Sequence, residues 1–168
     1  MENPDWIVAP ARSAALEVFE TMLAIPAEPG EAYWERRAPG PSDGLIAVVG
    51  MAGSWVGSGS FCCSANLARR IAAALLMAPY EEVDDDVLDA VAEVANMIVG
   101  NFKTTAEQTL GPLGLGIPTV IYGMNFVARS AAKEQWLVLP FLAGDEHFEL
   151  RICLTPNRGV PRLVHGAA

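Results

Sequence analysis

The sequence predicts an α+β fold in which a unit of one helix and three strands occurs twice, forming a mainly antiparallel sheet with long helices packed on one face. Its 168 residues, 52% of them hydrophobic, suit one domain with a sizeable core. The predicted elements run helix, three strands, helix, and then helix and three strands again. The leading helices SAALEVFE (residues 13–20) and DAVAEVAN (residues 89–96) share Ala, Glu and Val at equivalent places. A period this long indicates two fused copies of one unit rather than a solenoid.

The first unit is predicted to open with a helix over residues 11–24. Its apolar side chains recur at helical spacing, and Pro26 and Pro29 follow its end. Residues 31–38, EAYWERRA, are typical of a strand, and residues 38–44, APGPSDG, are predicted to form a turn-rich connector. The helix of the first unit is therefore followed by one short strand before the rest of the sheet.

A hairpin and a second helix complete the first half. Residues 45–50 and 54–63 have the composition of strands and are expected to meet in a turn near Gly53. Ser64 is a good N-cap for the helix that follows, because its hydroxyl can accept a hydrogen bond from a free backbone N–H. Pro79 terminates that helix, since proline cannot continue it.

The second half begins with a long helix, predicted from Asp84 to Leu110. At 1.5 Å per residue such a helix is roughly 40 Å long. The sequence GPLGLG ends it, and residues 117–123 (IPTVIYG) are predicted to be a strand. Residues 134–142 and 147–155, separated by AGDE, predict a final hairpin.

These elements predict a single domain over residues 1–156. Its two half-repeats cover about residues 11–63 and 84–155, and the helix over residues 64–78 links them. Residues 157–168 are expected to be a flexible tail, as chain ends commonly are.

The charge balance excludes several classes of partner. Net charge is −9, from 20 acidic against 11 basic residues, and basic residues come in isolated pairs such as Arg36–Arg37 and Arg69–Arg70. Nucleic acid and anionic membranes are therefore not expected as partners. No segment approaches the ~18 continuous apolar residues of a membrane span, and the start of the sequence is acidic where a secretory signal is basic. We expect a cytoplasmic protein that acts on proteins or small molecules.

The cysteines and histidines predict no metal site and no thiol chemistry. Cys62 and Cys63 are adjacent, so in a strand they point to opposite faces, and Cys153 is distant. We expect core thiols. His147 and His165 are single and far apart, which makes neither a credible catalytic base.

The long helix carries a polar stripe whose charges lack a cation. Asp89, Glu93 and Asn96 fall at i, i+4 and i+7 and share one face. A helix built for stability would place Lys or Arg four residues after Glu93, but Met97 stands there. The stripe continues through Gly100, which is about 1 kcal/mol less favourable than Ala inside a helix. An ordinary solvated surface would explain the stripe. Gly100 would be explained either by the close approach of another molecule or by packing inside the chain.

A carboxylate beside an amide suits work on a phosphorylated partner. The carboxylate can engage an external cation, and the amide can both donate and accept hydrogen bonds and so orient a water. Phosphoryl transfer depends mostly on positioning and electrostatics, so one water-orienting amide can matter. Glutamate and asparagine alone make a poor metal site and a poor nucleophile.

The stripe resembles the motif of the CheC/CheX/FliY chemotaxis phosphatases. In that motif Asp or Ser is followed after three residues by Glu, after two more by Asn, and about twenty residues later by Pro. Here it falls on Asp89, Glu93, Asn96 and Pro118. The likeness extends from EVFETML in the first helix through LIAVVGMAG to IPTVIYG, so it covers most of the chain, and it is nearest to the CheX type.

The resemblance implies a CheC-like fold and hydrolysis of the aspartyl phosphate of a CheY-like receiver domain. By position, Glu93 would pair with the receiver's active-site lysine and Asn96 would orient the attacking water. Asp89 would have a supporting electrostatic role, and Pro118 would shape the entry into its strand. The resemblance further implies a homodimer, no cofactor bound by this chain, and Mg²⁺ bound by the receiver.

The first helix predicts that each chain has one working site. Ser13 and Glu17 match the motif there, but Glu20 stands where asparagine is needed, and a carboxylate cannot donate hydrogen bonds. Two alternatives remain. A non-catalytic member would dock a receiver as a binding or scaffold module, and an unrelated small-molecule enzyme would need a pocket or a metal near Glu93.

Overall fold

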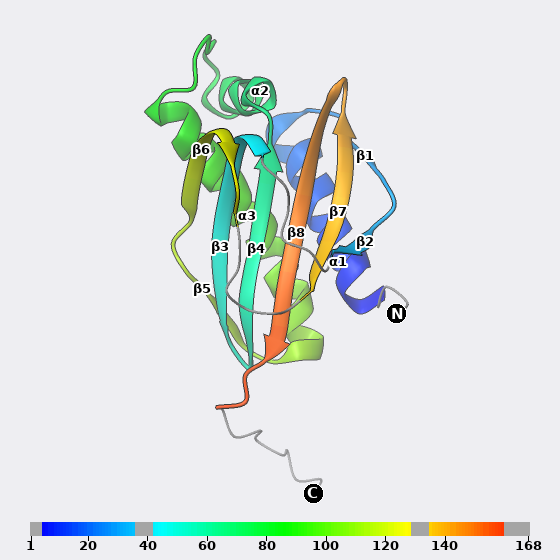
Figure 1. The fold of residues 1–168 in the computed structure, drawn as a ribbon. Coiled ribbons are helices and arrows are strands. Elements are labelled where there is room, and N and C mark those ends of the chain that lie inside the picture. The colour runs from blue at the N-terminus through cyan, green and yellow to red at the C-terminus, as the bar shows by residue number, and fades with distance from the viewer. Residues whose placement is uncertain (1–4, 36–41, 129–134, 160–168) are drawn as a thin grey trace, which may run out of the picture.

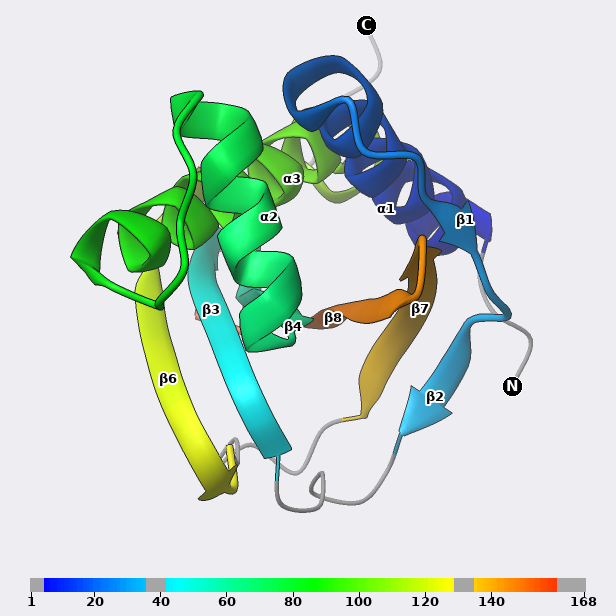
Figure 2. The ribbon, with the colours of Figure 1, turned by 90° about the horizontal axis from the view of Figure 1, so that it is seen from above.

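The computed structural model describes residues 5–35, 42–128 and 135–159, which form one sheet with helices on one face (Figures 1 and 2). The α+β class predicted from the sequence is confirmed. The helices are α1 (Asp5–Val18), the π-helix η1 (Phe19–Leu23), α2 (Ala65–Leu76) and α3 (Asp85–Leu110). The strands are β1 (Glu28–Pro29), β2 (Tyr33–Glu35), β3 (Ser42–Gly53), β4 (Trp55–Cys63), β5 (Leu113–Leu115), β6 (Thr119–Phe126), β7 (Trp136–Ala143) and β8 (Glu146–Pro156).

The strand order supports the proposed duplication. Across the sheet the order is β1-β7-β8-β4-β3-β5, with β2 also pairing with β7 and β6 also pairing with β3, and every described pairing is antiparallel. From β2 inward one meets β7, β8 and β4; from β6 inward one meets β3, β4 and β8. Each half places a hairpin at the centre of the sheet, β3–β4 from the first half and β7–β8 from the second. The first strand of each half pairs with the hairpin of the other half, β2 with β7 and β6 with β3, as expected for two copies of one unit.

The core lies between the sheet and the helices α1 and α3, which pack against each other on the same face (Figure 2). Four phenylalanines join the halves: the Phe19 ring stacks on Phe148 with centroids 4.2 Å apart, and Phe148 also stacks on Phe141 at 4.7 Å. The Phe61 ring closes the group 5.4 Å from Phe148. Such contacts stabilise a core beyond the area that they bury.

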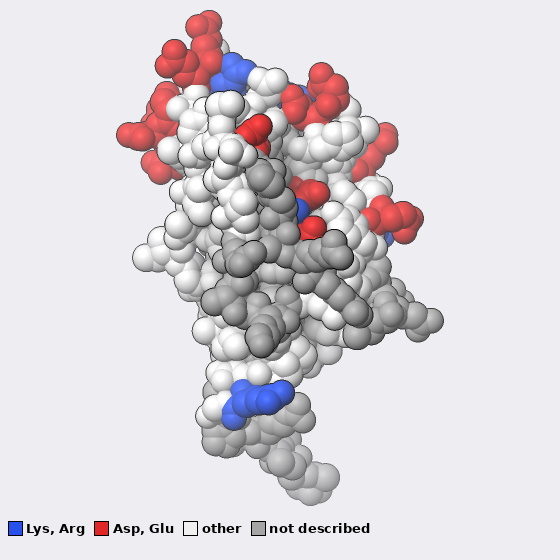
Figure 3. Space-filling model, viewed as in Figure 1, with Lys and Arg blue, Asp and Glu red and all other residues white. Residues whose placement is uncertain are grey.

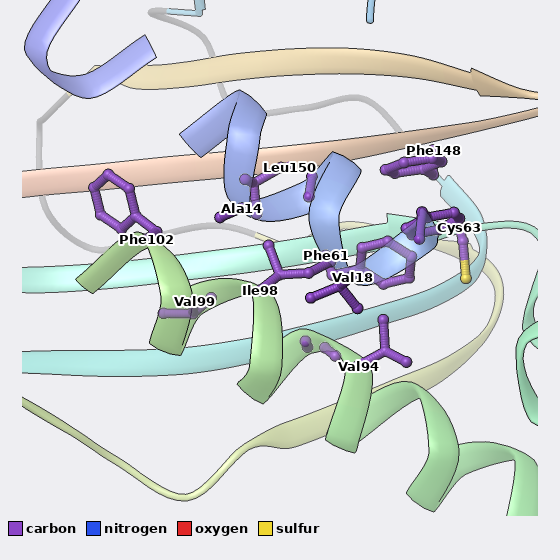
Figure 4. Close-up of a cluster of buried hydrophobic side chains, with 14 of the residues drawn as sticks. Ala14, Val18, Phe61, Cys63, Val94, Ile98, Val99, Phe102, Phe148 and Leu150 are labelled. Atoms are coloured by element: carbon purple, nitrogen blue, oxygen red, sulfur yellow. The ribbon is translucent and has the colours of Figure 1, made fainter. Parts of the chain in front are cut away.

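Helix α3 lies very close to the centre of the sheet (Figure 4). Its buried face includes Val94, Ile98, Val99 and Phe102. Opposite Val99 the strand β4 has Gly59, and a Cβ atom there would lie only 2.7 Å from the Val99 Cγ2 atom. The glycine therefore makes room for the helix, which is one of the recognised uses of glycine inside a strand.

Local signals in the sequence placed the Ser64 cap and the hairpins correctly, and the structure adds a cap at Asp84, which was predicted to be the first residue of its helix. The Ser64 hydroxyl accepts the Leu67 N–H at 3.0 Å, and the Asp84 carboxylate accepts the Val87 N–H at the same distance. Both predicted hairpins are present. In the part of the chain that the structure describes, no helix is long and apolar enough to cross a membrane.

Several boundaries differ from the prediction. The first helix starts at Asp5 rather than at residue 11, and Pro10 lies within it. Strand β3 starts at Ser42, inside the predicted connector, and the short strands β1 and β5 were not predicted. Residues 36–41 and 160–168, which hold the rest of the connector and most of the predicted tail with His165, lie outside the described residues.

The contact between Gly59 and Val99 predicts a large effect of a single methyl group. Gly59→Ala should lower the free energy of unfolding by about 1–3 kcal/mol, because the added atom overlaps Val99 in a closely packed core. Urea unfolding followed by circular dichroism measures the change. Gly50→Ala is the matched strand control, since a Cβ atom at Gly50 meets nothing within 4 Å. Equal stability of the two variants would contradict this account of the packing.

Candidate active site

The long helix α3 begins in a strongly acidic part of the surface. Asp84 caps it, and Asp85 and Asp86 occupy its first turn, where the helix dipole favours negative charge. The exposed Glu81 and Glu82 precede them in the chain, and Figure 3 shows acidic side chains gathered at the upper left of the molecule, where Figure 1 has the start of α3. The dipole effect fades after the first turn, so it does not account for the carboxylates farther along the helix.

The sequence-predicted stripe is on the outside of α3. Asp89 and Glu93 are exposed and Asn96 is half-buried, whereas Val91, Val94, Ala95 and Ile98 on the other faces are buried. Among the described residues, no side chain forms an ion pair or a hydrogen bond with Asp89, Glu93 or Asn96. All three polar groups are therefore available to a partner.

Two turns after Asn96 the stripe continues through Lys103 and Glu107, which pair with each other. Lys103 Nζ lies 3.1 Å from Glu107 Oε1, and that carboxylate also accepts the Leu113 N–H at 2.8 Å. The hydrogen bond from Leu113, together with Lys103, lowers the pKa of the Glu107 carboxyl. Glu107 thus ties the end of α3 to β5, and the stripe divides into an unpaired half before Gly100 and a paired half after it.

Gly100 is not required by packing inside the chain. A Cβ atom at this position would meet only the Leu115 Cδ1 atom among the described residues, at 3.8 Å, which is ordinary van der Waals contact. Of the two explanations left open by the sequence, internal packing therefore loses its support. Pro118 directly precedes β6, the strand whose entry it was expected to shape.

The first helix does not reproduce this arrangement. Ser13 and Glu17 are exposed on α1, but Glu20 falls in the π-helix η1, where the backbone no longer has α-helical spacing. Glu20 therefore differs from Asn96 both in its side chain and in the backbone that carries it. This second difference was not visible in the sequence.

The thiols and a large cavity on the sheet lie away from the stripe. Cys62 and Cys63 point to opposite faces of β4, as predicted, and burial raises the pKa of both thiols, that of Cys62 to about 12. A cavity of about 720 Å³ lies on the sheet face opposite the helices, lined in part by Ile46, Cys62 and Arg151. None of its lining residues belongs to α3, and among the described residues no group of three or more His, Cys, Asp or Glu is placed to hold a metal.

Solved structures share this fold along nearly their whole length. CheX from Desulfovibrio desulfuricans has a TM-score of 0.80 and 28% identity, over 89% of this chain and 99% of that chain. CheX in the CheX–CheY–BeF3–Mg²⁺ complex from Borrelia burgdorferi has a TM-score of 0.74 and 28% identity, over 88% of this chain and 97% of that chain. Fold and stripe together define a protein of the CheC-like class.

Sequence comparison assigns the family within that class. Residues 45–142 match the family described as chemotaxis phosphatase CheX. This chain belongs to the CheX family. A relative from Thermotoga maritima, named CheY-P phosphatase CheX, is 26% identical over 110 residues, which cover 64% of this chain and 70% of the relative.

The raised thiol pKa predicts slow alkylation of the native protein. At pH 8 a thiol whose pKa is raised by burial has far less thiolate than an ordinary cysteine, so Cys62 should react with iodoacetamide many times more slowly in the native protein than in urea. Mass spectrometry of timed samples measures the reaction. Rapid labelling of Cys62 in the folded protein would contradict the burial and would reopen a thiol-based mechanism.

Proposed function

We propose that this chain hydrolyses the aspartyl phosphate of a CheY-like receiver domain and so terminates a chemotaxis or two-component signal. Its family, the name of the T. maritima relative and the B. burgdorferi complex support the proposal. The observation that carries it is the exposed and unpaired Glu93, one turn before Asn96 on the outside of α3.

In this proposal Glu93 holds the partner and Asn96 performs the positioning. Glu93 pairs with the receiver's active-site lysine and sets α3 against the phosphorylated aspartate. The Asn96 amide enters that site and holds a water in line with the phosphorus atom. The water oxygen bonds to phosphorus as the bond from phosphorus to the aspartate oxygen breaks, which leaves inorganic phosphate and a free carboxylate on the receiver.

Other groups assist from the same face. Asp89, one turn before Glu93, adds negative charge that attracts the cationic partner group. Gly100 lets the receiver approach the helix backbone, and Pro118 fixes the entry into β6. A Mg²⁺ ion held by the receiver rather than by this chain would neutralise charge on the phosphoryl oxygens.

We further propose that the protein acts as a homodimer in the cytoplasm, in line with its resemblance to CheX-type phosphatases. A receiver-binding scaffold of the same fold is the alternative function. The two differ at Asn96, because a scaffold needs the docking charge of Glu93 but no group that orients water.

Substituting the two stripe residues should separate catalysis from binding. Asn96→Ala is expected to slow decay of a phosphorylated receiver by about a hundredfold while binding is retained, as loss of one preorganised polar group does in other enzymes. Glu93→Ala is expected to weaken binding itself. Release of radiolabelled phosphate and titration of the receiver measure the two effects.

Two exposed residues outside the stripe provide controls. Asn101→Ala removes an amide from α3, and Glu82→Ala removes a carboxylate before the helix, and both variants should behave as the native protein does. If the native protein leaves receiver decay unchanged across the plausible receivers of its organism, the catalytic function is wrong. Binding without faster decay would establish the scaffold instead.

Gly100→Ala should raise stability and lower activity together. The alanine fits beside Leu115 and is a better helix former, so unfolding should require about 1 kcal/mol more. The same methyl group stands where the receiver is proposed to approach, so dephosphorylation should slow. Thermal unfolding and phosphate release measure the pair. A more stable variant with native activity would remove Gly100 from the site.

A further inference from the structure

The face of the sheet away from the helices is hollowed over the strand β4. Figure 1 looks onto this face, with β3, β4 and β8 side by side in front of the helices. Gly59 of β4 faces α3, so its neighbours Ser58 and Ser60 point to the other side, as does Cys62. These three outward side chains are small, and they form part of the floor of the cavity of about 720 Å³. Pockets of this volume hold small molecules.

The two sides of this cavity differ in chemistry. On one side β3 and β6 contribute the apolar residues Ile46, Val48 and Ile121. On the other side β8 contributes Glu149 and Arg151. The small residues of β4 lie between the two sides, because β4 pairs with β3 and with β8. The cavity therefore suits a molecule with an apolar body and a polar end.

Arg151 is already occupied by two carboxylates. Its Nε and Nη2 atoms lie 2.9 and 2.8 Å from Glu149 Oε2, and its Nη1 atom lies 2.8 Å from Glu35 Oε2. The Arg151 side chain is only 16% exposed, so solvent screens these ion pairs weakly. An anionic ligand would have to displace one of the two carboxylates, and a displaced carboxylate loses its partner at a considerable cost. Arg151 is therefore a poor site for an anion.

The same contacts leave one oxygen of Glu149 available to a ligand. Arg151 contacts only Oε2 of this carboxylate, and no described residue donates a hydrogen bond to Oε1. A carboxylate that is held in place bonds most strongly to a charged donor such as an ammonium group. Asp43 adds a second carboxylate to the lining, and Trp136 adds an indole ring, a group that attracts cations through its face. These groups favour a cationic end on the ligand.

We propose that this cavity binds a small organic cation, an amine with an apolar body. The ammonium group donates to Glu149 Oε1, and the apolar body lies against Ile46, Val48 and Ile121. Affinity comes from the burial of the apolar body, and selectivity comes from the carboxylate that receives the ammonium group. The inference goes beyond the proposed function and does not rest on it.

The cavity and the α3 stripe lie on opposite faces of the sheet. None of the residues that line the cavity belongs to α3. Figure 2 shows the helices together on the other side, where the receiver is proposed to bind. An amine in the cavity therefore leaves Glu93 and Asn96 uncovered, and the amine site can be tested without a receiver.

Three probes that share one body test the class of ligand. 4-Phenylbutylamine, 4-phenylbutanol and 4-phenylbutyrate each have a phenyl ring on a four-carbon chain, and at about pH 8 their ends are cationic, neutral and anionic. The amine should bind the native full chain about tenfold or more tightly than the alcohol, because a hydrogen bond to a charged group is the stronger. The butyrate should bind most weakly. Ligand-detected NMR titration measures all three.

Two variants locate the amine in the cavity. Glu149→Gln keeps the size of the side chain and removes its charge, so the preference for the amine over the alcohol should fall to within about twofold. Ser58→Leu fills the floor and should weaken the amine and the alcohol alike, by about tenfold. The matched controls are Glu82→Gln, in the loop before α3, and Thr155→Leu, which lies opposite Val56 on β8 outside the lining. Both controls should bind as the native protein does.

The measurement on the native protein decides the class without any variant. If it does not bind the amine, or binds the alcohol or the butyrate as tightly, the cationic ligand is wrong. Unchanged affinity in Ser58→Leu, with its fold verified by circular dichroism, would place the probe elsewhere and overturn the site. Asn96→Ala should bind the amine with native affinity although its phosphatase activity is expected to be lost. The amine site and the proposed function therefore fail separately.

Discussion

The packing of α3 against the sheet determines where every group of the candidate site points. Because Gly59 has no side chain, Val99 approaches the β4 backbone and the helix lies close along the strand. Successive residues in an α-helix turn by about 100°, so burying Val99 and its neighbours leaves one outward direction for the stripe. That direction faces solvent beside β6. A roll of the helix by one residue would bury a carboxylate such as Glu93 without a partner, which is strongly unfavourable.

The two halves have the same strand plan but different helices, and the core explains the difference. In the first half the helix ends in a π-helical turn, which carries Phe19 into the stack with Phe148. Glu20 lies in that turn, so the place that corresponds to Asn96 has lost the α-helical register as well as the amide. In the second half α3 stays α-helical through Asn96 and Gly100. The first half therefore has a structural helix, and the second half has a helix with a free polar face.

The sequence predicted those features that depend on short-range patterns. Helical spacing placed Glu93 and Asn96 on one face, and local hydrogen-bond chemistry predicted the Ser64 cap. Features that depend on distant segments were not predictable. The contact of Val99 with Gly59 depends on how α3 is aligned on the sheet, which the local sequence does not specify. Nothing in the sequence around Lys103 and Glu107 indicates that this ion pair also holds the start of β5. The exposure of β6 likewise follows from its edge position, which only the strand order reveals.

The unpaired half of the stripe is best understood by comparison with the paired half. Lys103 and Glu107 have the i, i+4 spacing that stabilises a helix by about 0.2–0.5 kcal/mol, whereas Asp89 and Glu93 have the same spacing with like charges, which destabilises it by a similar amount. A cation at residue 97 would correct this, yet Met97 there packs against the core. Such a cation would also pair with the Glu93 carboxylate and make it unavailable to a partner. A free carboxylate beside a free amide is a surface that a partner can complete and that this chain leaves incomplete.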